Sequence, residues 1–108
     1  MVRRHSSIRE IANDVVNFLS SYIKVEGLVL FGSYSKKTQR EDSDIDMAVI
    51  SSDFEKMDVL EKIQLLSKVP VFVDSRIELL GFSKRAFLKP EKTSLLALIK
   101  KTGQILFK

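Results

Sequence analysis

The sequence predicts a small α/β (α+β) domain, in which helices flank a small mixed sheet. Apolar residues recur at three- and four-residue steps between positions 7 and 23, which is the period of an amphipathic helix. Two short apolar runs, VEGLVLF and DIDMAVIS, have the length and composition of buried strands. The two patterns alternate along the chain, as expected when helices pack against a sheet.

The first predicted helix covers 7–23, and Ser6 or Ser7 is expected to cap it. The first predicted strand covers 25–31 and ends at Gly32. Its shortness favours a buried strand over a helix.

Residues 33–43 are polar and have no clear period, so one helical turn followed by a loop is expected there. A second strand is predicted over 44–51. Helical spacing returns over 54–68, where Asp53 is a suitable N-cap and Pro70 marks the exit.

A third strand is predicted over 71–80, ended by Gly81. Alternation along a strand would put Asp74, Arg76 and Glu78 on one face of it. This two-residue spacing of charged side chains makes the strand a candidate contributor to a functional site.

The last predicted helix covers 94–101, starts at Thr93 or Ser94 and ends at Gly103 as its C′ residue. The closing residues 104–107 are expected to form a short strand or a docked tail. Counting the turn after the first strand, the predicted order is helix, strand, helix, strand, helix, strand, helix.

Length and composition fit one domain spanning 1–108. The apolar (44%) and charged (30%) fractions are ordinary for a globular protein. The absence of cysteine excludes disulfides and thiolate zinc sites. No apolar stretch follows the basic start as a signal peptide requires, and none is long enough to span a membrane. We therefore expect a soluble, cytoplasmic protein with no membrane partner.

The net charge of +4 is concentrated near the C-terminal end. Residues 84–108 hold seven Lys and Arg side chains and one acid, Glu91. A basic segment favours polyanions such as RNA or a nucleotide triphosphate. The alternative is a solvated helix face that binds nothing.

Gly32 and Ser33 have the properties of a phosphate-binding turn. A glycine at a strand end lets phosphate approach the backbone without a Cβ in the way. A helical turn after it would aim N–H groups at the anion, and the Ser33 hydroxyl adds a donor.

Asp44 and Asp46 alternate along the second strand and so point to one face. Magnesium takes carboxylate and phosphate oxygens as ligands, and two such ions can activate an attacking oxygen and steady the leaving one. Glu78 is the first candidate for a third carboxylate, and Asp74 the second. Converging carboxylates repel one another without a cation, which is a physical reason to expect a metal.

The spacing Gly-Ser, ten residues, Asp-x-Asp on an apolar strand resembles the signature of the DNA polymerase β-like nucleotidyltransferase superfamily. Within it, the chain looks like the minimal nucleotidyltransferases, and the likeness covers nearly the whole length. The resemblance implies that Gly32 and Ser33 hold the β- and γ-phosphates. It implies that Asp44 and Asp46 bind magnesium, with Asp46 bridging two ions, and that Lys36 touches phosphate.

The resemblance also implies that Glu78 is the third carboxylate, where relatives more often have Asp, and that it assists a second metal and acts as base. Lys37 stands where relatives commonly have glycine. The implied activity is transfer of AMP from ATP to a tyrosine of a partner, typically a helical HEPN toxin, with this protein as the antitoxin.

Two other functions stay open at this point. One is a non-catalytic module that neutralises a HEPN partner by binding it. The other is an RNA-binding or RNA-modifying protein, for which the basic segment 84–108 is the motivation, although Phe82 and Phe87 are better explained as core anchors. An edge strand of the small sheet also leaves room for a homodimer.

Overall fold

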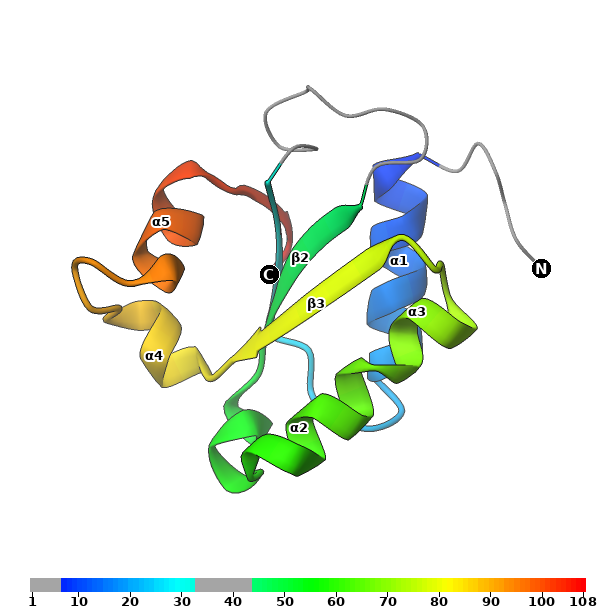
Figure 1. Cartoon of the computed structure of the whole chain (residues 1–108), viewed down its shortest axis with the longest axis horizontal. Helices are drawn as coiled ribbons and strands as arrows, with labels where there is room; N and C mark the ends of the chain where they lie inside the picture. Colours follow the sequence, from blue (N-terminus) through cyan, green and yellow to red (C-terminus); the bar gives the residue numbers. More distant parts are fainter. Residues whose placement is uncertain (1–6, 33–43) are drawn as a thin grey trace.

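The computed structural model describes residues 7–32 and 44–108. The elements follow in the order α1 (Ile8–Leu19), β1 (Gly27–Phe31), β2 (Ile45–Ile50), the 3-10 helix η1 (Ser52–Lys56), α2 (Val59–Leu66), α3 (Lys68–Phe72), β3 (Ile77–Phe82), α4 (Lys84–Leu88), α5 (Leu95–Thr102) and β4 (Gln104–Phe107). The four strands form one mixed sheet with helices on both sides (Figure 1). The predicted fold class is confirmed.

The order of strands in the sheet is β3-β2-β1-β4. β1 is antiparallel to β2 and to β4, whereas β2 and β3 are parallel. The end of β1 and the starts of β2 and β3 therefore lie at the same end of the sheet. In this register Asp46 is opposite Phe31 on one side and opposite Glu78 on the other.

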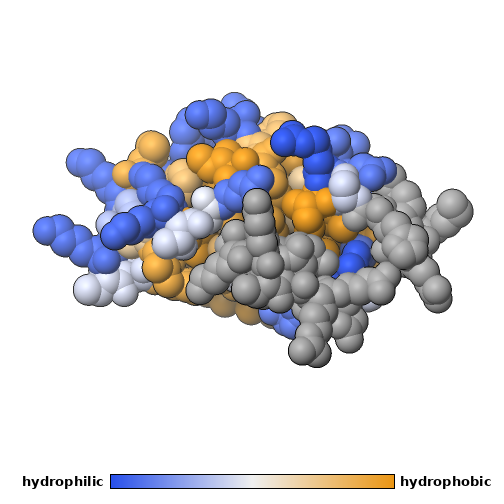
Figure 2. Space-filling view, turned by 90° about the horizontal axis from the view of Figure 1, so that it is seen from above, coloured by the Kyte–Doolittle hydropathy of each residue, from blue (hydrophilic) through white to orange (hydrophobic). Residues whose placement is uncertain are grey.

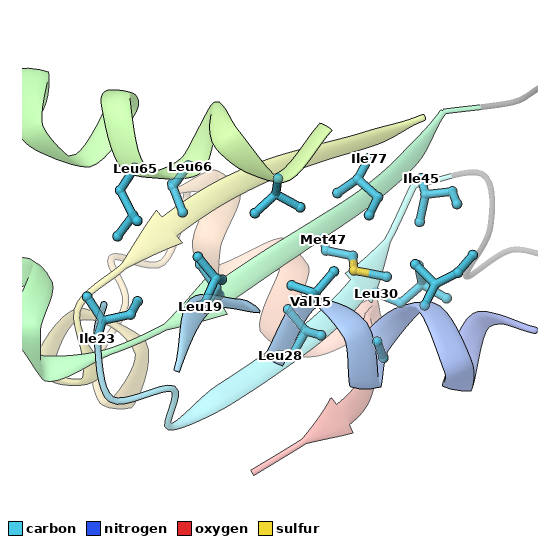
Figure 3. Packing of buried hydrophobic residues seen from close by; sticks show 14 of the residues in the cluster. Val15, Leu19, Ile23, Leu28, Leu30, Ile45, Met47, Leu65, Leu66 and Ile77 are labelled. Carbon is cyan, nitrogen blue, oxygen red and sulfur yellow. The ribbon is translucent and has the colours of Figure 1, made fainter. Parts of the chain in front are cut away.

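The main core lies between one face of the sheet and the helices α1, α2 and α3 (Figure 3). This cluster includes Val15, Leu19, Leu28, Leu30, Ile45, Met47, Leu66 and Ile77. A smaller cluster on the other face joins Val29, Ala48 and Ile99, with Phe31, Phe82 and Phe87 packed against it. The expectation that Phe82 and Phe87 act as core anchors is confirmed.

Helix α1 begins where its cap was expected. The Ser7 hydroxyl accepts a hydrogen bond from Glu10 N, and the Glu10 carboxylate accepts one from Ser7 N. This reciprocal pair satisfies two N–H groups that a helix start otherwise leaves unpaired. The helix is shorter than predicted, because it ends at Leu19 and the chain then turns to bury Ile23.

The single helix predicted over 54–68 is wrong in its start and its cap. The chain instead forms η1 and then α2, whose N-cap is Asp58. Asp58 Oδ1 accepts from Glu61 N at 2.8 Å, so the sequence Asp-x-x-Glu forms a capping box. Asp53 lies inside η1, where its carboxylate accepts from Lys24 N at 2.8 Å.

The third strand is shorter than predicted. Residues 68–72 form α3, and Pro70 lies within its first turn, where its missing N–H costs no helical hydrogen bond. β3 starts at Ile77 and includes Gly81, which does not end the strand. Asp74 and Arg76 lie in the turn before the strand, so the predicted shared face of Asp74, Arg76 and Glu78 is wrong.

The C-terminal part contains one helix that was not predicted, α4, capped by Ser83. α5 is capped by Ser94, one of the two expected residues. Gly103 ends α5 but has φ −75°, so it is not in the left-handed conformation of a C′ glycine. Of the short strand and the docked tail expected for the closing residues, the structure has the strand, the edge strand β4.

Several apolar side chains reach the surface beside charged ones, as Figure 2 shows for one face. Across 7–32 and 44–108, no helix combines the length and the apolar character that crossing a bilayer requires.

We expect Asp74→Asn to destabilise the fold by about 1 kcal/mol at pH 7. The Asp74 carboxylate accepts from Arg76 N, Nε and Nη2 at 2.9, 3.1 and 2.9 Å. These bonds to Arg76 hold the pKa of Asp74 below its ordinary value. The carboxylate therefore stabilises the fold at pH values above the unfolded pKa, and the contribution is lost as pH falls through the lower, folded pKa.

Urea unfolding of both proteins between pH 3 and 7 measures this effect. The difference between wild type and variant should shrink below about pH 4. Glu55→Gln, at an exposed acid on η1, is the control and should change the free energy of unfolding little. A difference for Asp74→Asn that does not depend on pH would contradict the assignment.

Candidate active site

The candidate site lies at the end of the sheet where β1 stops. Gly32 follows β1 directly and has φ +76°, a left-handed conformation that favours glycine. A Cβ added to Gly32 would collide with Asp46 Oδ2 and would lie 3.3 Å from Asp46 Cβ. The backbone of the turn thus lies against the Asp46 carboxylate, and a side chain at position 32 would displace that carboxylate.

The three candidate carboxylates all lie at this end of the sheet. Asp46, in β2, is half-buried, whereas Glu78 in β3 and Asp44 just before β2 are exposed. Strand alternation directs Asp46 and Glu78 away from the main core, because Ile45 and Ile77 are buried within it. The parallel register places Asp46 directly opposite Glu78.

The electrostatics show that these acids interact. A hydrogen bond with the Asp46 carboxyl raises the pKa of Glu78 above its ordinary value, and the negative charges of Asp44 and Asp46 raise it further. Like charges held near one another have this effect. The site is therefore a place where a cation would relieve repulsion.

The residues partly fit a magnesium site. Oxygen donors of this kind are the ligands that Mg²⁺ takes, together with phosphate oxygens. Within the described part of the chain, however, no three His, Cys, Asp or Glu side chains are grouped closely enough to hold a metal by themselves. The pair in contact is Asp46 and Glu78, and Asp44 acts on Glu78 through its charge.

The other predicted residues divide into two groups. Ser33, Lys36 and Lys37 lie outside the described residues, so their expected contacts with phosphate stay predictions. Asp74, the second choice for the third carboxylate, is engaged with Arg76 in the turn before β3.

One feature beside the site was not predicted. A groove of about 480 Å³ runs along β3, lined by Glu78, Leu80 and by residues of α2 such as Ile63. The signal that would have helped is the Asp58–Glu61 capping box, because it sets the start of α2, the helix that lines the groove.

Comparison with known proteins identifies the class. The model of the family described as polymerase beta, nucleotidyltransferase, matches residues 13–108. The chain therefore belongs to the polymerase β nucleotidyltransferase family, as its mixed sheet and strand-end carboxylates suggest.

The relatives narrow this class to the minimal nucleotidyltransferase type. Protein adenylyltransferase MntA of Shewanella oneidensis is 37% identical over 68 residues, which are 62% of this chain and 48% of that protein. The match thus spans about half of that curated relative.

Two solved structures are also similar. A toxin–antitoxin with AMP-PNP has TM-score 0.63 at 29% identity, covering 88% of this chain and 71% of that one. A tri-AMPylated Shewanella oneidensis HEPN toxin in complex with MNT antitoxin gives TM-score 0.57 at 25% identity, covering 90% and 69%.

We expect Gly32→Ala to lower nucleotide transfer about 100-fold, because a Cβ would push the Asp46 carboxylate aside by roughly 1 Å. The left-handed backbone adds a destabilisation of about 1–2 kcal/mol. Transfer assays and urea unfolding measure the two effects. Gly27→Ala, at the start of β1 and without positive φ, is the matched control. Equal activity of the two variants would contradict the role of Gly32.

Proposed function

We propose that this protein transfers AMP from ATP to a tyrosine hydroxyl of a HEPN-domain toxin and so acts as its antitoxin. The observation that carries the proposal is the contact of Asp46 with both Glu78 and the Gly32 turn. In the sheet of this nucleotidyltransferase domain, the contact joins a pair of carboxylates to a turn at which an added side chain would displace Asp46.

The proposed reaction is a displacement at the α-phosphorus of ATP. The acceptor oxygen forms a bond to that phosphorus, and the bond from the α-phosphorus to the bridging oxygen breaks. Pyrophosphate leaves with the electron pair, and the acceptor loses its proton. Glu78, an exposed carboxylate opposite Asp46, is suited by its position to take up that proton.

We further propose that Asp44, Asp46 and Glu78 hold Mg²⁺, in a two-ion arrangement. When bound, magnesium would neutralise negative charge on the phosphates and polarise them. The raised pKa of Glu78 supports this, because it reports mutual repulsion of carboxylates that a cation would offset. Gly32 and Ser33 would bind the β- and γ-phosphates, and Lys36 would add a positive charge.

The choice of acceptor rests on the relatives. One similar structure contains an AMPylated HEPN toxin beside an MNT antitoxin, and another contains AMP-PNP, an ATP analogue. A similar curated protein is a protein adenylyltransferase. We propose the same substrate pair for this chain.

Incubation with ATP labelled at the α-phosphate, magnesium and a HEPN protein from the same genome tests the proposal. We expect label in the HEPN protein, lost when its acceptor tyrosine is changed to Phe. Asp46→Asn should reduce labelling about 10²–10³-fold, because it removes charge at the reacting phosphate. Glu91→Gln, an exposed acid elsewhere, is the control and should label normally.

Labelling by Asp46→Asn at the wild-type rate would overturn the proposal. Neutralisation of the HEPN protein only at equimolar antitoxin, without label, would instead support the non-catalytic binding module. An enzyme should neutralise many toxin molecules per antitoxin molecule.

Glu78→Gln is expected to lower kcat for transfer about 100-fold while the KM for ATP changes less than about threefold. The reason is that the proton acceptor acts mainly in the transition state, whereas the triphosphate is held by other groups. Steady-state kinetics at saturating acceptor measure both constants. A large rise in KM with unchanged kcat would assign Glu78 to nucleotide binding instead.

A further inference from the structure

The groove beside the candidate site lies between β3 and the helices α2 and α3, which run alongside that strand (Figure 1). Its walls are mostly apolar: Ile63, Leu66 and Pro70 on the helices, and Leu79 and Leu80 on the strand. Glu78 also lines the groove, so the groove borders one of the three carboxylates of the candidate active site.

Among the strands formed by residues 7–32 and 44–108, β3 lies at an edge of the sheet. The hydrogen bonds from Ile45 N to Arg76 O (2.8 Å) and from Ser51 N to Phe82 O (3.0 Å) fix which of its residues bond to β2. Because bonding alternates along a parallel strand, the peptide groups of the intervening Leu79 point away from β2. They face the groove edge, where an added strand could bond to them.

The apolar walls are open to solvent at two positions. Ile63 is 56% exposed and Leu80 is 39% exposed. The charged side chains among the lining residues are Glu78 and Lys62, and the Lys62 ammonium already donates to Gly81 O at 3.0 Å. The groove therefore fits apolar side chains along its length and a polar group at the Glu78 end.

We propose that this groove binds an extended, mainly apolar segment of the acceptor protein, which adds to the free edge of β3 and presents its hydroxyl to Glu78. Extended segments bind sheet edges in this way, with main-chain bonds for affinity and alternate side chains in pockets for specificity. The identity of the acceptor as a HEPN protein rests on the function proposed above; the place of docking rests on the groove.

Charge favours an acceptor segment over a second copy of this chain. Parallel, in-register pairing of β3 with β3 of another copy would place Glu78 beside its own copy, although Asp46 and Asp44 already raise the pKa of that carboxyl. Like charges brought close across paired strands are destabilising. A neutral segment has no such cost.

Binding of the HEPN protein is measured without ATP, so that docking is separated from transfer. Ile63→Glu places a charge in the groove and should raise Kd about tenfold or more. Leu98→Glu is the matched control, because Leu98 is equally exposed at 56% and lies on α5, away from the groove. Its Kd and its circular dichroism should match those of wild type.

Hydrogen exchange provides a second readout. Peptides covering 77–82 should gain protection in the complex, including at the Leu79 amide. Asp46→Asn should dock with a Kd within about twofold of wild type while losing transfer. Docking at β3 without any transfer of AMP would reject the proposed function and keep this inference.

Four results would overturn the inference. The first is that the HEPN protein does not bind, and the second is that Ile63→Glu leaves its Kd unchanged. The third is that the complex protects other peptides from exchange but not those covering 77–82. The fourth is that 77–82 are protected in the free protein, to a degree that rises with protein concentration. The last would assign the groove to self-association. Transfer of AMP by the wild type alongside any of the first three would leave the proposed function standing.

Discussion

The parallel pairing of β2 with β3 is the constraint on which the candidate site depends. It sets Asp46 opposite Glu78, and it does so at the end of the sheet where β1 delivers Gly32. A slip of one residue in either strand would turn its carboxylate toward the helices and expose its core side chains. The buried partners Ile45 and Ile77 therefore hold the register, and through it they hold the acids.

In this arrangement, neighbouring residues of one strand contribute separately to the stability of the fold and to the candidate site. β2 alternates between side chains that fill the core and side chains that serve the other face, so Met47 and Asp46 are adjacent in sequence but contribute to different properties. The acids lie at the start of the strand, close to solvent, and the strand is otherwise buried. Repulsion among the acids is thus confined to the end of the sheet, where ions and phosphates can reach it.

The sequence was sufficient to predict those elements whose apolar residues recur at a regular spacing within one segment. The spacing of apolar residues located α1, β1 and β2. The Asp-x-Asp alternation predicted a shared face for both acids, of which Asp46 lies in β2 and Asp44 just before it. The apolar pattern was misleading over 71–76, because Val71 and Phe72 have the composition of a strand, whereas they belong to α3, which follows α2 almost directly. The partner of Glu78 could be predicted only as a neighbour on another strand, since register depends on contacts between segments far apart in sequence.

The free edge of β3 has a consequence for the protein in the absence of any partner. Exposed strand edges recruit strands from other molecules and lead to aggregation, and charged side chains, lysine above all, are a common protection. Lys62 occupies the carbonyl of Gly81 and so shortens the stretch of edge that a stray strand can use. Lys62, which also lines the groove, would thus help to keep the protein monomeric at high concentration, as charged residues beside aggregation-prone strands do.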